Sequence, residues 1–182
     1  GCNSISNTAG LQRFTKATNT WTNITPSGLD ARVPDLELSS TGRFHVICGY
    51  YNTAAGSAGY RYTDNPATVS SGTWTSPATT FPTQYNVAIE SNGNTLYALP
   101  SNSAWGVPTI YKSTNGGANW AATGATPAFT SGQAWYCMAV AIDPNNANNV
   151  IVGSLDCYKT TNGGTSWTKI SEWVGTTGQY VH

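Results

Sequence analysis

The residues best suited to acid–base chemistry in this chain are the carboxylic acids Asp30, Asp35, Asp156 and Glu172. Hydrolysis of a glycosidic bond requires two carboxyl groups held across the bond, and their separation decides the stereochemical outcome. Asp30 or Asp35 could pair with Asp156 or Glu172, although the sequence does not determine the distance between them. These four residues are the catalytic candidates.

Five aromatic residues form a second candidate group, namely Tyr50, Tyr51, Trp105, Trp135 and Trp173. Each lies in a stretch that also contains Asn, Ser, Thr or Gly. Aromatic rings present an apolar face on which a sugar ring can stack, and hydroxyl and amide groups supply the hydrogen bonds around it. The pattern favours a carbohydrate-binding surface. The alternative is that these rings pack loops against the rest of the fold.

Charged residues make up only 9% of the 182-residue chain, and eight acidic residues balance eight basic ones. A neutral chain offers no electrostatic attraction to nucleic acid or to an anionic membrane surface. No apolar run is long enough to insert into a bilayer. Aromatic residues, at 12%, provide ample apolar area to bury. This composition is typical of a secreted or cell-surface β protein, so we expect an extracellular location.

The four cysteines, Cys2, Cys48, Cys137 and Cys157, lack the spacing of a zinc site. Two disulfides are possible, and the sequence allows three connectivities. Cys48 also fits a free buried thiol, because it lies inside the apolar run 44–48. No phosphate-binding or metal-ligand pattern is present, so we expect neither a metal nor a cofactor.

Four tryptophans recur at nearly constant spacing. They are Trp21, Trp74, Trp120 and Trp167, which stand 53, 46 and 47 residues apart. The segments that end at the last two are closely similar in sequence. A repeat of this length, rich in strand-forming residues, is the size of one four-stranded β-propeller blade. An ordinary β-sandwich is the alternative, but sandwiches do not usually repeat one phrase at a fixed period. The sequence therefore predicts an all-β fold of propeller blades.

Aligned on the tryptophans, each repeat reads as four antiparallel strands, A to D. In the first complete repeat we predict strand D at 73–76, after an insertion around Asn65-Pro66, and in the third we predict the turn between strands A and B at 143–149. We predict complete blades at about 35–77, 85–123 and 136–170, a partial blade at 1–27 and the start of a further blade at 179–182. Three complete blades do not comfortably close a ring. We therefore interpret 1–182 as one segment of a longer propeller, completed by the rest of its own protein or by another chain.

The turns before the last two tryptophans read Ser-Thr-Asn-Gly-Gly-Ala-Asn-Trp (113–120) and Thr-Thr-Asn-Gly-Gly-Thr-Ser-Trp (160–167). These phrases resemble the Asp-box, the repeat found in sialidases, xyloglucanase-type glycosidases and sortilin-type receptors, with Asn where the family commonly has Asp. The resemblance implies C–D hairpins whose structural residues are Ser113, Asn115, Gly117 and Trp120, and Thr160, Asn162, Gly164 and Trp167. We expect side-chain bonds to the hairpin backbone, a positive φ at the glycine and an indole that fills the space beside the hairpin.

Arg32, in Ala-Arg-Val-Pro, is similar to the arginine of the sialidase Arg-Ile-Pro motif. That family binds a substrate carboxylate with three arginines, a use that suits the planar guanidinium. Only Arg32 of the four arginines in this chain lies in a matching context. The sequence therefore argues against sialidase activity from this segment alone.

Strand direction alternates within a blade, so the C–D hairpins share one face with the A–B turns. All of the aromatic candidates fall in the B–C and D–A connections, on the opposite face. The sequence predicts that this face, with Arg32 nearby, binds a glycan or glycoprotein. Two alternatives remain open: a glycoside hydrolase whose catalytic residues lie partly outside this segment, and a structural or protein-binding propeller of a larger extracellular assembly. We expect binding rather than catalysis from this segment.

Overall fold

The computed structural model describes residues 10–171 and residue 173. The start of the predicted partial blade (1–9), Glu172 and the strand predicted at 179–182 lie outside the described residues. Within the described range the chain forms four antiparallel sheets and one short 3-10 turn, Ala55–Ser57. In that same range no helix has the length and hydropathy needed to cross a membrane. The predicted all-β fold is confirmed.

Consecutive strands are neighbours within each sheet, as in a β-meander. Blade 1 contains β1 (Gln12–Thr15) and β2 (Thr20–Asn23); blade 2 contains β3 (Leu36–Leu38), β4 (Phe44–Cys48) and β5 (Gly59–Thr63). Blade 3 contains β6 (Val87–Asn92), β7 (Thr95–Pro100), β8 (Tyr111–Ser113) and β9 (Ala121–Ala122). Blade 4 contains β10 (Ala139–Asp143), β11 (Asn146–Gly153), β12 (Cys157–Thr160) and β13 (Thr168–Ser171).

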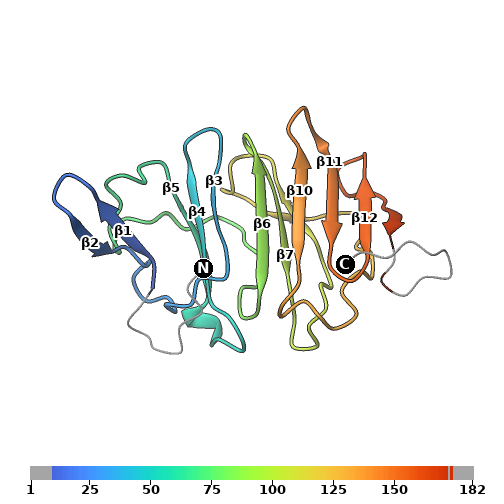
Figure 1. Cartoon of the computed structure of the whole chain (residues 1–182), viewed down its shortest axis with the longest axis horizontal. Coiled ribbons are helices and arrows are strands. Elements are labelled where there is room, and N and C mark those ends of the chain that lie inside the picture. Colours follow the sequence, from blue (N-terminus) through green and yellow to red (C-terminus); the bar gives the residue numbers. More distant parts are fainter. Residues whose placement is uncertain (1–9, 172, 174–182) are drawn as a thin grey trace.

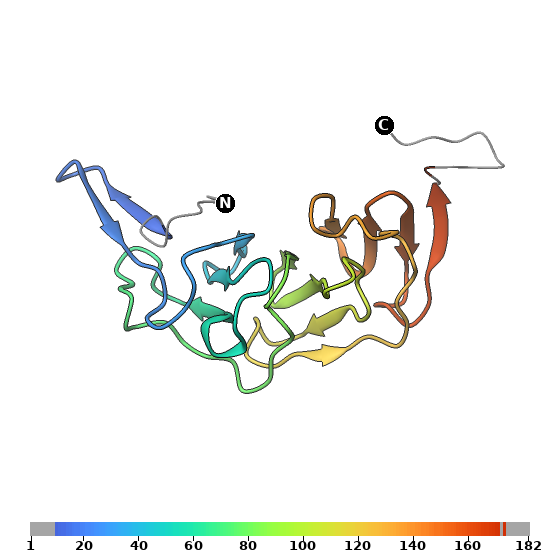
Figure 2. The same cartoon turned by 90° about the horizontal axis from the view of Figure 1, so that it is seen from below.

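The blades stand side by side (Figure 1) and follow an open arc (Figure 2). The first strands of blades 2, 3 and 4 lie on the concave side of this arc, and β6 contacts both β3 and β10. Such a radial arrangement, with the first strand of each sheet nearest a common axis, is that of consecutive propeller blades.

The fourth strand of blade 2, predicted at 73–76, is reduced to one bridge between Tyr62 and Thr75. The inserted residues 64–72 explain this difference, because they form their own turns. The amides of Thr68 and Val69 both donate to the carbonyl of Asn65, at 3.1 and 2.9 Å. The chain therefore reaches Thr75 through a wide loop instead of a tight hairpin.

The turn predicted at 143–149 is shorter than expected, since β11 already begins at Asn146 and pairs there with Asp143. The Asp143 carboxylate accepts the backbone N–H of Asn145 and the side-chain amide of Asn149, each at 2.9 Å. Local bonds from Asx side chains compete with the strand ladder and tighten such turns.

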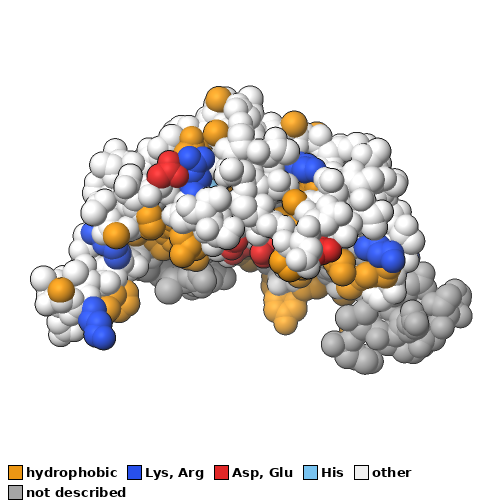
Figure 3. Space-filling model, turned by 90° about the horizontal axis from the view of Figure 1, so that it is seen from above, with side chains coloured by type: hydrophobic (Ala, Val, Ile, Leu, Met, Phe, Trp, Pro, Cys, Tyr) orange, Lys and Arg blue, Asp and Glu red, His pale blue; other side chains and the backbone are white. Residues whose placement is uncertain are grey.

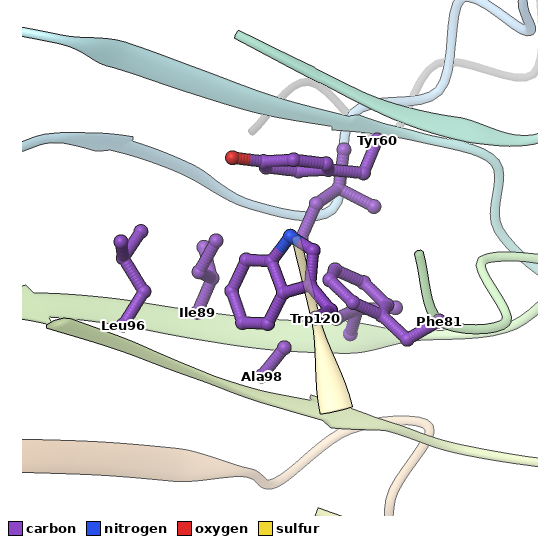
Figure 4. Close-up of a cluster of buried hydrophobic side chains, with 8 residues drawn as sticks. Tyr60, Phe81, Ile89, Leu96, Ala98 and Trp120 are labelled. Atoms are coloured by element: carbon purple, nitrogen blue, oxygen red, sulfur yellow. The ribbon is translucent and has the colours of Figure 1, made fainter. Parts of the chain in front are cut away.

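The core lies between neighbouring blades, where aromatic and aliphatic side chains of two sheets interlock (Figure 4). Trp120 of blade 3 is 5% exposed, and its ring centroid lies 4.8 Å from that of Phe81 and 5.4 Å from that of Tyr60 in blade 2. Both contacts are edge-on, a favoured geometry for aromatic pairs. This indole therefore joins blade 3 to blade 2.

The turns at 113–120 and 160–167, hereafter the Asn-Gly-Gly hairpins, share one bonding pattern. In the first, Ser113 Oγ accepts the Gly117 N–H at 2.9 Å and Asn115 Oδ1 accepts the Asn119 N–H at 2.9 Å. The second repeats both bonds: Thr160 Oγ1 with the Gly164 N–H at 3.1 Å, and Asn162 Oδ1 with the Ser166 N–H at 3.0 Å. Gly117 and Gly164 have φ values of +80° and +91°, a region that favours glycine.

Candidate functional site

A cleft of about 460 Å³ opens on the face opposite the Asn-Gly-Gly hairpins, where the first strands of blades 2, 3 and 4 begin. Its aromatic lining comes from Tyr50, Trp135 and Tyr136, and its polar lining from Arg32, Asp35 and Asn86. The remaining lining residues are apolar. Four connections therefore meet at this cleft: the one before β3, the β4–β5 loop, the end of the β5–β6 connection and the β9–β10 connection.

A direct hydrogen bond joins two of these connections, because the Tyr50 hydroxyl donates to the carbonyl oxygen of Trp135 at 3.0 Å. The Trp135 side chain is 45% exposed, and its ring centroid lies 5.3 Å from that of Tyr136. The side-chain amide of Asn86 holds the same segment, donating to the carbonyl of Ala134 at 2.8 Å. The backbone around Trp135 is therefore anchored while its indole remains accessible.

Trp105 and Tyr51 do not line the cleft, but Trp105 packs against Tyr50, which does. The ring centroid of Trp105 is 5.6 Å from that of Tyr51 in a stacked geometry, 5.4 Å from that of Tyr85 edge-on, and 6.5 Å from that of Tyr50. Trp105 and Tyr51 have φ values of +56° and +51°, which non-glycine residues rarely adopt. Strain of this kind persists where the surrounding structure enforces it, and it often accompanies binding sites.

Arg32 reaches the cleft with its guanidinium fixed by Asp30. The Asp30 carboxylate accepts bonds from Arg32 Nε at 2.8 Å and Nη2 at 2.6 Å, and Nη2 also donates to Thr53 Oγ1 at 2.9 Å. The hydrogen bond from Arg32 lowers the pKa of Asp30, and the same bond raises the pKa of Arg32. Asp30 is therefore a charged positioning residue for Arg32.

Asp35 is the one carboxylic acid among the described residues that line the cleft. Its Oδ1 accepts the Leu36 N–H at 2.8 Å, and its Oδ2 accepts the Ile89 N–H of blade 3 at 2.9 Å. Burial raises the pKa of Asp35 above its ordinary value, although these two backbone bonds oppose the shift. The side chain therefore connects the first strands of two blades at the floor of the cleft.

The other acidic candidate in the described chain, Asp156, does not line the cleft. Its Oδ2 lies 3.0 Å from Lys169 Nζ, and its Oδ1 accepts the backbone N–H of Trp173 at 3.0 Å. Trp173 is 44% exposed but belongs to this second location in blade 4. Glu172 lies outside the described residues. A catalytic pair drawn from these acids stays a prediction.

The remaining arginines are engaged away from the cleft. Arg13 donates to the Val69 carbonyl at 2.7 Å, and Arg61 to the Tyr60 carbonyl at 2.8 Å. Arg43 forms an ion pair with Asp64 on the hairpin face. The described part of the chain therefore gives the cleft one guanidinium, which is fewer than the cluster of three that a sialidase-type carboxylate site uses.

No group of three or more His, Cys, Asp or Glu side chains in the described residues is arranged to hold a metal ion. The three described cysteines, Cys48, Cys137 and Cys157, are free, and Cys2 lies outside the described residues. Burial raises the pKa of Cys48 to about 12, so this thiol stays protonated and packs as a small apolar group.

Sequence reasoning did not identify Asn86 as a cleft residue. The repeat contains a signal for it, because Asn86 occupies the position of Asp35 at the start of the first strand. Both side chains reach forward to the next blade, Asp35 to the Ile89 amide and Asn86 to the Ala134 carbonyl. Met138 and Pro34 also line the cleft, and no feature of their types or spacing indicates this.

No protein-family model matches the chain, and no curated protein matches it. Among solved structures, the GH74 enzyme of Niastella koreensis aligns with a TM-score of 0.62 and 18% identity, over 91% of this chain and 27% of that one. The GH74 xyloglucanase of Xanthomonas campestris aligns with a TM-score of 0.57 and 16% identity, over 91% of this chain and 28% of that one. At such low identity the likeness shows the fold alone, so the chain has the β-propeller blade architecture found in part of two GH74 enzymes.

Proposed function

We propose that this chain is the glycan-binding part of an extracellular Asp-box β-propeller, and that its cleft holds a segment of a polysaccharide. One observation carries the proposal: an exposed indole, Trp135, stands beside anchored polar groups in a single cleft. A sugar ring needs both an apolar surface for its C–H face and directed hydrogen bonds for its hydroxyl groups.

The dimensions and chemistry of the cleft agree with this role. Its volume of about 460 Å³ falls within the range of small-molecule sites, which is roughly 300–1,000 Å³. Trp135 and Tyr136 offer stacking surfaces, and Arg32 and Asn86 lie among the polar lining residues. The bonds from Arg32 to Asp30 and from Tyr50 to the Trp135 backbone hold these groups in place before a ligand arrives, which reduces the entropic cost of binding.

The structural neighbours support a carbohydrate ligand. One of them is described as a GH74 xyloglucanase. The chain spans 27% and 28% of the two neighbours, so their complete activities are a guide to the class of ligand and no more. A neutral chain with few charges is consistent with an uncharged polysaccharide as the ligand.

A binding role is favoured over catalysis because the described residues place a single carboxylic acid in the cleft. Glycoside hydrolysis generally requires two, and both oxygens of Asp35 already accept backbone amide bonds. The second candidate function, a glycoside hydrolase, is favoured by the raised pKa of Asp35, since a general acid must hold its proton until it reacts. That function would need a second carboxylate from beyond the described residues.

Affinity electrophoresis against a set of soluble polysaccharides, including xyloglucan, tests the proposal. We expect at least one polysaccharide to retard the protein, with no release of reducing ends. Retardation accompanied by reducing-end release that is lost in Asp35→Asn would favour the hydrolase. Absence of retardation by every polysaccharide would contradict a glycan-binding role and favour a protein-binding propeller.

A further inference from the structure

Tyr51 and Trp105 continue the aromatic surface beyond the cleft. Tyr51 is 63% exposed, and its ring is stacked on that of Trp105. Trp105 also packs edge-on against Tyr85 and contacts Tyr50 of the cleft. We call these four residues the aromatic ridge; the loops that carry them lie on the side from which Figure 2 is seen. On the hairpin face, shown in Figure 3, hydrophobic side chains over the middle of the arc stand mostly as separate spots.

A second pocket, of about 200 Å³, adjoins the aromatic ridge. Tyr85 belongs to the ridge and also lines this pocket, whereas Asn86, the next residue along the chain, lines the cleft. Thr109 and Tyr111, at the start of the third strand of blade 3, line the second pocket as well, so it lies farther from the concave side than the cleft does. The cleft and the second pocket are therefore separated only by the segment 85–86 and the rings packed against it.

Hydrogen bonds hold the aromatic ridge in place from both sides. The carbonyl of Trp105 accepts the N–H of Ala134 at 3.0 Å, which ties the ridge to the segment that carries Trp135 in the cleft. On the other side, the Tyr85 hydroxyl donates to Asn52 Oδ1 at 3.4 Å. Within the 102–106 loop, Asn102 Oδ1 accepts the N–H groups of Ala104 and Gly106 at 3.0 and 3.1 Å. The ridge is therefore built before a ligand arrives, which lowers the entropic cost of binding along it.

The lining of the second pocket combines rigid apolar surfaces with an available polar group. Three of its residues are prolines, namely Pro82, Pro100 and Pro108, and no lining residue is charged. The side-chain amide of Gln84 is half-buried and has no hydrogen-bond partner among the described residues, so it can bond to a hydroxyl group of a ligand. The pocket is smaller than independent small-molecule sites of roughly 300–1,000 Å³, which suits one sugar unit of a chain that is also held elsewhere.

We propose that the polysaccharide held in the cleft continues over the exposed ring of Tyr51 and places a further sugar unit in the second pocket. This inference rests on the proposed glycan-binding role of the cleft and adds a second subsite to it. Continuity carries it, because Trp105 contacts a lining residue of the cleft, a lining residue of the second pocket and the exposed Tyr51 between them. The ligand class is an uncharged polysaccharide that is bound through several consecutive sugar units.

Isothermal titration with oligosaccharides of increasing length, cut from a polysaccharide that binds the wild type, tests the second subsite. We expect the longest oligosaccharides to bind the wild type at least about fivefold more tightly than the shortest that binds. Tyr51→Asn and Gln84→Ala should each weaken binding of the longest oligosaccharides by about threefold to tenfold and leave that of the shortest unchanged. Asparagine is chosen at position 51 because it tolerates the φ of +51°. Tyr51→Phe keeps the ring and should bind like the wild type.

Trp135→Ala is the comparison, because it alters the cleft itself and should weaken short and long oligosaccharides by the same factor. Thermal unfolding followed by circular dichroism establishes that each variant is folded. Affinity that does not depend on chain length, or folded Tyr51→Asn and Gln84→Ala variants that bind every length like the wild type, would overturn the second subsite and leave the cleft standing. Equal weakening at every length in these two variants would also overturn it, since they would then act on the cleft. Absence of binding by every glycan would overturn both proposals.

Discussion

The hydroxyl of Tyr60 lies 2.7 Å from Nδ1 of His45, and both side chains are completely buried where blade 2 meets blade 3. The second ring nitrogen of His45, Nε2, is buried without a hydrogen-bond partner. A charged imidazolium would be poorly solvated here, so burial lowers the pKa of His45 to about 4.

Stability is expected to fall as the pH falls from about 6.5 to about 4. The unfolded chain binds a proton at His45 below its ordinary pKa of about 6.5, whereas the folded chain resists protonation until about pH 4, so acid favours unfolding within this window. At about 1.36 kcal/mol per pH unit, the full loss is at most about 3 kcal/mol. Urea titrations at pH 5 and pH 7 measure it.

His45→Gln is the matched control for this effect, because glutamine keeps a polar partner for Tyr60 but does not titrate. The difference in unfolding free energy between pH 7 and pH 5 should be smaller in His45→Gln than in the wild type. Equal differences in the two proteins would show that carboxylates, and not His45, cause the acid sensitivity.

Replacing the hairpin glycines should destabilise the fold without changing ligand affinity. Gly117→Val and Gly164→Val are each expected to lower the unfolding free energy by about 1–3 kcal/mol, because a β-branched residue resists a positive φ. An added Cβ at Gly117 also meets the Tyr60 hydroxyl, and at Gly164 it meets the Thr123 side chain at 2.9 Å.

Gly93→Ala provides the comparison, since Gly93 has a φ of +59° but an added Cβ there meets only open space. Gly117→Ala should therefore cost more stability than Gly93→Ala in chemical denaturation. Similar losses at both positions would mean that backbone strain alone, and not contact with Tyr60, decides the requirement for glycine.

Truncating a repeat tryptophan to alanine is expected to lower the unfolding free energy much more in an inner blade than in the blade at the end of the arc. Trp120→Ala removes an indole packed against Phe81 and Tyr60, so we expect a loss of about 3–5 kcal/mol. Trp21→Ala should cost no more than about 0.5 kcal/mol, because its indole is mostly in solvent. Thermal and urea denaturation measure the loss of unfolding free energy in both variants. Similar losses in the two would contradict this account.

Asp35 is expected to contribute to stability through its bond to the next blade. Asp35→Ala leaves the Ile89 amide without its acceptor, which should cost about 1–3 kcal/mol in urea denaturation. Asp64→Ala is the control, because the Asp64 side chain is largely exposed and its ion pair with Arg43 should contribute less than about 1 kcal/mol. A loss at Asp35 no larger than that at Asp64 would argue against a structural role for this carboxylate.

The repeat made the blade architecture predictable, because tryptophan spacing and the Asn-Gly-Gly phrases report directly on strand and hairpin periodicity. The strand predicted at 73–76 failed because the bonds within 64–72 compete with hairpin pairing, and the sequence shows the insertion but not its turns. Gly116 and Gly163 were also missed, since both adopt positive φ beside the glycines that the resemblance singles out.

For the candidate site, the sequence predicted which face of the blades it lies on, but not which residues line it. Strand alternation assigns Tyr50, Trp105 and Trp135 to the same side of the blades, but Trp173 lies beside Asp156 instead of the cleft. Loop conformations such as the positive φ at Trp105 depend on contacts between loops of different blades, and no local pattern encodes them. Asp30 and Arg32 stand only two residues apart in sequence, yet the bidentate geometry of their pairing became evident only in the fold.

Isothermal titration with the best-binding polysaccharide, comparing Trp135→Ala with Trp173→Ala, tests the glycan-binding cleft most directly. The two indoles are matched in exposure, at 45% and 44%, but only Trp135 lines the cleft. Loss of one stacking contact is worth on the order of 1 kcal/mol, so we predict up to about tenfold weaker binding for Trp135→Ala and unchanged binding for Trp173→Ala. Unchanged affinity in a folded Trp135→Ala, or a loss confined to Trp173→Ala, would contradict the assignment of the cleft.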